Sequence, residues 1–86
     1  MKHKKEPNGT LYTIGRGKNR CKVWVPQSGL MYLSLSTIPA IIRMTAGKPI
    51  TVLEGQGYMR AADVIAEMPE RSESIRALAQ RLGATV

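Results

Sequence analysis

The sequence predicts an α+β fold: a small antiparallel sheet of three to four strands, with a β-hairpin first, packed against two or three helices. Runs of β-branched, aromatic or alternating apolar residues predict strands at 11–14, 21–25, 30–35 and 50–53. Apolar residues recur at helical spacing over roughly 37–46, 59–68 and 70–82. Glycine and proline separate these segments, and 86 residues suffice for one domain with a thin core.

The first nine residues, MKHKKEPNG, differ in composition from the rest of the chain. They are polar and charged, and Pro7 and Gly9 interrupt them. Segments of this kind lack the apolar residues that would anchor them to a core. We therefore expect a flexible basic arm over 1–9, followed by a single domain over 10–86.

The turn between the first two strands is basic. It carries Arg16, Lys18 and Arg20 together with Gly15, Gly17 and Asn19. Glycine and asparagine accept the positive φ values that a tight reversal needs, so the turn can project its charges away from the core. This turn is the first candidate for a binding surface.

Alternation in the strand over 21–25 places Lys22 and Trp24 on the same face. If this strand pairs with the next one, Tyr32 can lie beside Trp24 on that face. Exposed rings next to cations suit nucleic acid, because bases stack on rings and phosphates attract cations. The other interpretation is a cross-strand aromatic pair, or a half-buried tryptophan covered by a helix.

The helix expected over 37–46 begins at the N-cap residues Ser36 and Thr37 and ends at Gly47, with Arg43 outside its apolar stripe. After the strand at 50–53, two glycines over 54–57 predict a turn whose spacing is not that of a phosphate-binding loop.

The two later helices are separated by Pro69, and Gly83 fits the C-cap of the last one. The helix over 70–82 is expected to serve packing or dimerisation. The methionines and the apolar end at Ala84 to Val86 predict apolar surface that a homodimer would cover.

The positive charge is concentrated near the N-terminus. The chain has 13 Lys and Arg against 6 Asp and Glu, and seven of the cations fall within residues 1–24 beside Glu6 alone. Such asymmetry is typical of proteins with a polyanionic partner, either nucleic acid or an acidic protein face. A surface that serves only solubility is the alternative.

The sequence gives little support for a catalytic site or a metal-binding site. Cys21 is the only cysteine and His3 the only histidine, which excludes an internal disulfide and a Cys/His zinc site within one chain. Cys21 occupies an inward-facing strand position, where an inert buried thiol is expected. We expect no enzyme, no cofactor and no metal.

No apolar run approaches the roughly 20 residues of a membrane span, and the N-terminus lacks the apolar segment of a signal peptide. We expect a soluble cytoplasmic protein without a membrane partner.

The function predicted from these patterns is a non-enzymatic binding module, regulatory or accessory, with nucleic acid as partner and DNA favoured over RNA. The candidate nucleic-acid-binding residues are Arg16, Lys18, Asn19, Arg20, Lys22, Trp24, Tyr32 and Arg43. The alternative is an inhibitor or adaptor of the phage or mobile-element type, which docks its basic surface on an acidic face of a protein of the nucleic-acid machinery.

A set of short matches to a known family spans roughly residues 16–68: Asn19-Arg20 in the basic turn, Tyr32 to Leu35 entering a helix, Gly47 after it, Ile50 to Val52, and Gly57 followed by Val64-Ile65. Through these residues the chain resembles the N-terminal DNA-binding domain of polyhydroxyalkanoate synthesis regulators. The match needs gaps at 25–29 and 54–57. Val23 stands where the family has a tyrosine, and Lys22 where it has an apolar residue. The resemblance implies a DNA-binding domain that oligomerises, with contacts through Asn19 and Arg20.

Overall fold

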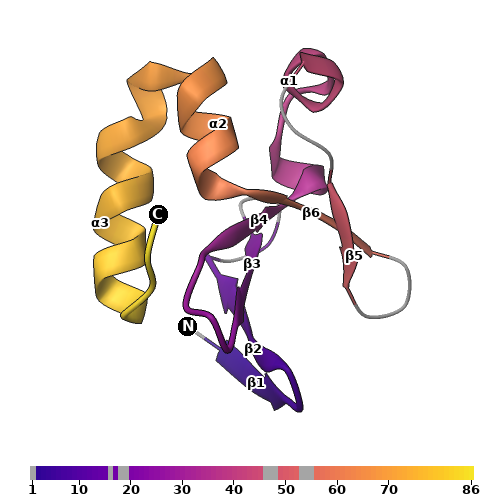
Figure 1. Ribbon diagram of the computed structural model, residues 1–86, viewed down its shortest axis with the longest axis vertical. Coiled ribbons are helices and arrows are strands. Elements are labelled where there is room, and N and C mark those ends of the chain that lie inside the picture. Colours follow the sequence, from indigo (N-terminus) through magenta and orange to yellow (C-terminus); the bar gives the residue numbers. More distant parts are fainter. Residues whose placement is uncertain (1, 16, 18–19, 46–48, 53–55) are drawn as a thin grey trace.

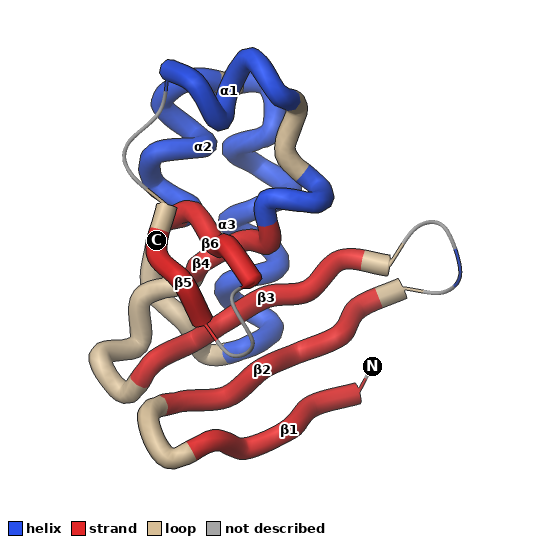
Figure 2. The backbone as a smooth tube through the Cα atoms, turned by 90° about the vertical axis from the view of Figure 1, so that its right-hand side faces the viewer, coloured by secondary structure: helices blue, strands red, loops and turns tan. Residues whose placement is uncertain are grey.

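The computed structural model describes residues 2–15, 17, 20–45, 49–52 and 56–86, and within them six strands form one curled antiparallel sheet (Figures 1 and 2). The strand order is β1-β2-β3-β4-β6-β5. The strands are β1 (Lys2–Glu6), β2 (Gly9–Ile14), β3 (Cys21–Pro26), β4 (Tyr32–Ser34), β5 (Ile50–Val52) and β6 (Gln56–Arg60). The helices in the same residues are α1 (Ala40–Thr45), α2 (Ala61–Glu67) and α3 (Ser72–Leu82), with short 3₁₀ turns η2 (Leu35–Thr37) and η3 (Pro69–Arg71).

The predicted α+β class is confirmed, and the predicted number of strands is too low. One missed strand is β1, which occupies most of the segment expected to be a flexible arm. Every residue of β1 pairs with β2, from Lys2 opposite Thr13 to Glu6 opposite Gly9. Backbone hydrogen bonds to a neighbouring strand do not require apolar side chains, so a charged edge strand is stable there and also discourages pairing with other chains.

The other missed strand is β6, which replaces part of the turn predicted over 54–57 and the first residues of the helix predicted from 59. Tyr58 and Met59 are both fully buried although they are adjacent in the chain. A strand sends neighbouring side chains to opposite faces, so it can bury both in two separate clusters. The helix then begins at Ala61.

The core lies on both faces of the curled sheet. On one face Val23, Leu33 and Met59 stand in register across β3, β4 and β6, and they form one cluster with side chains of α2 and α3. On the other face the β5–β6 hairpin brings Val52 against Trp24. Figure 1 shows α2 and α3 next to each other on one side of the sheet, with β5 and β6 extending away from them.

The last residues of the chain are part of this core. Gly83 ends α3 at φ 69°, as its predicted C-cap role requires, and turns the chain back toward the sheet. The Thr85 amide donates to the Gly29 carbonyl at 2.7 Å, and the Thr85 carbonyl accepts from the Met31 amide at 2.9 Å. Ala84 and Val86 are half-buried against the main cluster, so this apolar end is partly covered within one chain and gives little support to the predicted homodimer.

The central position of Met59 leads to a stability prediction. Met59→Ala should lower the free energy of unfolding by about 2–5 kcal/mol, because it removes a fully buried side chain and leaves a cavity. The measurement is urea unfolding followed by the fluorescence of Trp24, the single tryptophan. Ile41→Ala is the control, since Ile41 is 69% exposed and its loss should cost less than about 0.5 kcal/mol. Equal effects of the two substitutions would contradict this core.

Candidate functional site

The strand register brings cations from separate parts of the sequence to one end of the sheet. Lys2 at the start of β1 and Lys22 near the start of β3 both pair with Thr13 of β2. The turn that joins β2 to β3 leaves from this same end, where β1 also begins (Figure 2). Gly15 and Gly17 in that turn have φ values of 86° and 57°, as the predicted tight reversal requires.

The predicted residues Arg16, Lys18 and Asn19 lie outside the described residues. Arg20 closes the turn, with its amide donating to the Gly17 carbonyl at 3.3 Å, and its side chain is exposed. Lys22 lies on the face of β3 opposite to Cys21 and is half-buried.

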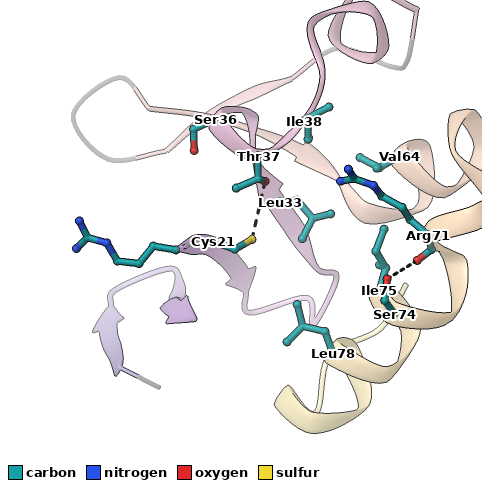
Figure 3. Close-up of a pocket in the computed structure, with 11 residues that line it drawn as sticks. Cys21, Leu33, Ser36, Thr37, Ile38, Val64, Arg71, Ser74, Ile75 and Leu78 are labelled. Carbon is teal, nitrogen blue, oxygen red and sulfur yellow. Dashed lines mark hydrogen bonds between the residues drawn. The ribbon is translucent and has the colours of Figure 1, made fainter. Parts of the chain in front are cut away.

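A hollow of about 640 Å³ opens between the sheet and the helices next to Arg20 (Figure 3). We call it the basic cleft. Its rim is polar, and its floor is made of apolar side chains that are buried, except for the half-buried Leu78. The rim residues are Arg20, Cys21, Ser36, Thr37, Arg71 and Ser74, and the floor residues are Leu33, Ile38, Val64, Ile75 and Leu78.

Each side of the basic cleft comes from a different part of the chain. Cys21 and Thr37 line it from β3 and η2, and Arg71 with Ser74 lines it from η3 and α3. Figure 3 shows the Arg71 side chain reaching across the hollow toward the side formed by Thr37 and Ile38. A ligand in the basic cleft would therefore contact the sheet and the helices at once.

A second hollow of about 280 Å³, which we call the side hollow, adjoins the basic cleft. It is lined by Lys22, Ser34, Leu35, Ser36 and Gly57, so Ser36 belongs to both hollows. A Cβ atom at Gly57 would meet Leu35 Cδ1 at 2.5 Å. Glycine thus lets η2 approach β6 closely and holds Ser36 between the two hollows.

Local hydrogen bonds orient the hydroxyl groups of η2. Thr37 Oγ1 donates to the Ser34 carbonyl at 2.8 Å, and the Ser34 and Ser36 hydroxyl groups lie 2.9 Å apart. The Ser36 amide also donates to Ser34 Oγ at 3.3 Å, which makes Ser34 the cap of η2. The helix predicted from 37 begins only at Ala40, and its predicted N-cap residues Ser36 and Thr37 lie within η2. Across the cleft, Ser74 Oγ donates to the Arg71 carbonyl at 3.0 Å. The rim therefore presents hydroxyl groups in defined positions.

The cations around the two hollows are not neutralised. In the described part of the chain, the ion pairs are Lys4 with Glu6 and Arg60 with Asp63. Arg20, Lys22 and Arg71 belong to neither pair, and the described residues that line the two hollows include no Asp or Glu. The site is thus electropositive, with charged groups available to a ligand.

The environment of Cys21 in the rim changes the pKa of its thiol. Burial raises the pKa of its thiol above the usual value, and the hydrogen bond to Thr37 and the charge of Arg71 lower that pKa by smaller amounts. The thiol donates to Thr37 Oγ1 at 3.8 Å. The Cys21 thiol is therefore protonated at neutral pH, in agreement with the inert thiol predicted for this position.

Trp24 and Tyr32 pair directly across β3 and β4, which confirms the predicted cross-strand neighbours. Trp24 is only 6% exposed, and it is buried in a cluster with Val52 of β5 and Tyr58 of β6 rather than beneath a helix. Tyr32 is half-buried in the same cluster. A base cannot stack on Trp24 while this cover is in place.

Arg43 lies apart from the other candidates. Its Nε donates to the Ile38 carbonyl at 3.0 Å, so it supports the entry into α1. It lines neither the basic cleft nor the side hollow.

Sequence reasoning missed Arg71, Ser74 and the hydroxyl groups of η2 as parts of one site. Arg71 is about fifty residues from the basic turn, and nothing in its local pattern distinguishes it from other helix-surface arginines. Its position becomes informative only when the packing of α3 places it opposite Cys21.

No protein-family model, curated protein or solved structure matches this chain. Across the described ranges, no helix combines the length and the apolar character needed to cross a membrane. The same residues contain no group of three or more His, Cys, Asp or Glu side chains that could hold a metal ion.

The environment of Cys21 predicts a pH-dependent reactivity. Because its pKa is raised, alkylation by iodoacetamide should be slower at pH 8 in the folded protein than in urea, and the rate should keep rising to higher pH. Thr37→Val should move the rate profile further toward high pH, because Thr37 lowers the pKa. Thr51→Val, at an exposed position in β5, should leave the profile unchanged. Coincident profiles for folded and unfolded protein would show that the thiol is not desolvated.

Proposed function

We propose that this protein is a nucleic-acid-binding module that holds a phosphodiester backbone at the basic end of its sheet. One observation carries the proposal: Arg20, Lys22 and Arg71, from three elements of the fold, lie without ion-pair partners around two adjoining hollows that no described acidic side chain lines. Arg16 and Lys18 come shortly before Arg20 in the sequence, which makes this segment of the chain strongly basic.

The chemistry of the rim suits phosphate groups. Arginine donates two parallel hydrogen bonds to phosphate oxygens, and serine and threonine hydroxyl groups add neutral donors. Most hydrogen bonds between proteins and nucleic acids go to phosphate and sugar from these residue types. Arg20 and Arg71 supply such donors at the basic cleft and Lys22 supplies them at the side hollow, and the Ser36 hydroxyl group lies between the two hollows.

DNA is the first nucleic acid to test, because the resemblance of residues 16–68 is to a DNA-binding domain. The phosphate contacts of the rim would serve RNA as well, so RNA of the same sequence belongs in the same experiment. Trp24 and Arg43 are not part of the proposed surface, since each is engaged within the fold.

The proposal predicts a specific loss in the double variant R20A/R71A. Binding of a labelled oligonucleotide, followed by fluorescence anisotropy, should weaken by about tenfold or more at about 100 mM salt. The slope of log K against log salt should fall by about two, one unit for each lost phosphate contact.

The matched control is R76A/R81A, which also removes two arginines, from exposed positions of α3 that do not line either hollow. It should keep most of the affinity, because it changes the net charge without changing the site. Equal losses in the two double variants would show that net charge alone causes binding. Absence of binding to every oligonucleotide at about 50 mM salt would remove the proposed function.

A further inference from the structure

We infer that the nucleic acid bound at this site is single-stranded, with one unstacked base inserted into the basic cleft. The inference rests on the proposed function and specifies its ligand. It follows from the combination of a charged rim with an apolar floor, which a phosphate-binding surface alone does not need.

The floor of the basic cleft is a part of the core that is open on one side. Leu33, Val64 and Ile75 are 6%, 1% and 7% exposed, so they pack tightly against one another beneath the hollow. Leu78 is half-buried and Arg71 is exposed, so the hollow opens to solvent between them. A ligand that fills it must therefore be apolar on its inner side and anionic or polar at its outer side.

An intact duplex meets only half of this requirement. Its phosphates could reach Arg20 and Arg71, but its bases stay stacked inside the helix and cannot enter a hollow. The part of the floor that is accessible to solvent, mainly Leu78, would then remain in contact with water. A single strand can turn one base into the hollow while its flanking phosphates stay at the rim.

The size and polarity of the hollow suit a base with its sugar. Its volume of about 640 Å³ lies in the range of pockets that hold small ligands, about 300 to 1,000 Å³. Extruded bases are held between aromatic or apolar side chains and read by hydrogen bonds at their edges. Leu78 and Ile75 supply the apolar contact. At the rim, the Ser36 hydroxyl group can donate or accept, and Ser74 Oγ, which donates to the Arg71 carbonyl, can accept.

Trp24 cannot supply base contacts on the sheet, because Val52 and Tyr58 pack against it. Among the hollows that the described residues line, the basic cleft combines arginines that form no ion pair with an apolar floor. Base recognition is therefore placed between the sheet and the helices rather than on the sheet face.

The test compares four ligands on the wild-type protein by anisotropy at about 100 mM salt. They are a short mixed-sequence single-stranded DNA, the RNA of the same sequence, the corresponding duplex, and the single strand with abasic sites in place of its nucleosides. The single strands should bind at least about tenfold tighter than the duplex and the abasic strand, because only they can place a base on the floor.

Two leucines of α3 provide a matched pair of variants. L78Q makes the floor polar and should weaken single-strand binding by about tenfold without changing the salt slope, since no phosphate contact is lost. L82Q changes another half-buried leucine of the same helix that does not line the cleft, and it should leave binding unchanged. Circular dichroism of both variants reports whether they remain folded, and the abasic strand tests the inference without any substitution.

The outcomes separate this inference from the proposed function. Base insertion would be overturned if the duplex bound as tightly as the single strand or more tightly, or if the abasic strand bound as tightly as the single strand. If R20A/R71A then lost this binding to the duplex or the abasic strand, the proposed function would still stand. Polyglutamate that binds as tightly as the single strand would overturn both and point to an acidic protein partner. Absence of binding to every oligonucleotide would overturn both as well.

Discussion

The register between β3 and its neighbours is the constraint on which the rest of this structure depends. Val23 is buried on one face of β3 and Trp24 on the other, and each has a buried or half-buried partner directly opposite on β4. A slip of one residue would exchange the two side chains between two differently shaped clusters. The curled sheet buries both faces at this point, so neither cluster could accept the exchange without loss of packing.

This register also determines the site. Because β3 alternates, Cys21 lines the basic cleft and Lys22 lines the side hollow on the opposite face. The turn η2 follows β4 directly, and the contact between Leu35 and Gly57 brings Ser36 to the boundary of the two hollows. The packing that buries Val23 thus places the polar groups that a ligand would meet.

The elements that the sequence predicts well are those with local signals. The glycines of the basic turn, the pairing of Trp24 with Tyr32, and the C-cap at Gly83 each depend on a few adjacent residues. The strand β1 has no apolar pattern and exists because β2 offers it an edge, so composition alone predicts an arm. The basic cleft was not predictable either, because Arg71 joins it only through the tertiary packing of α3.

Stability and binding can be changed separately in this fold, because stability depends on the floor residues of the basic cleft and binding depends mainly on its rim residues. Its floor residues Val64 and Ile75 belong to the core, and their truncation would lower the stability of the whole fold. Its rim residues Arg20 and Arg71 are exposed and form no ion pair with another described residue, so their side chains contribute little to stability. Evolution could therefore change the charge and hydrogen-bonding groups of the rim, and with them the preferred ligand, while the register and the core beneath remain unchanged.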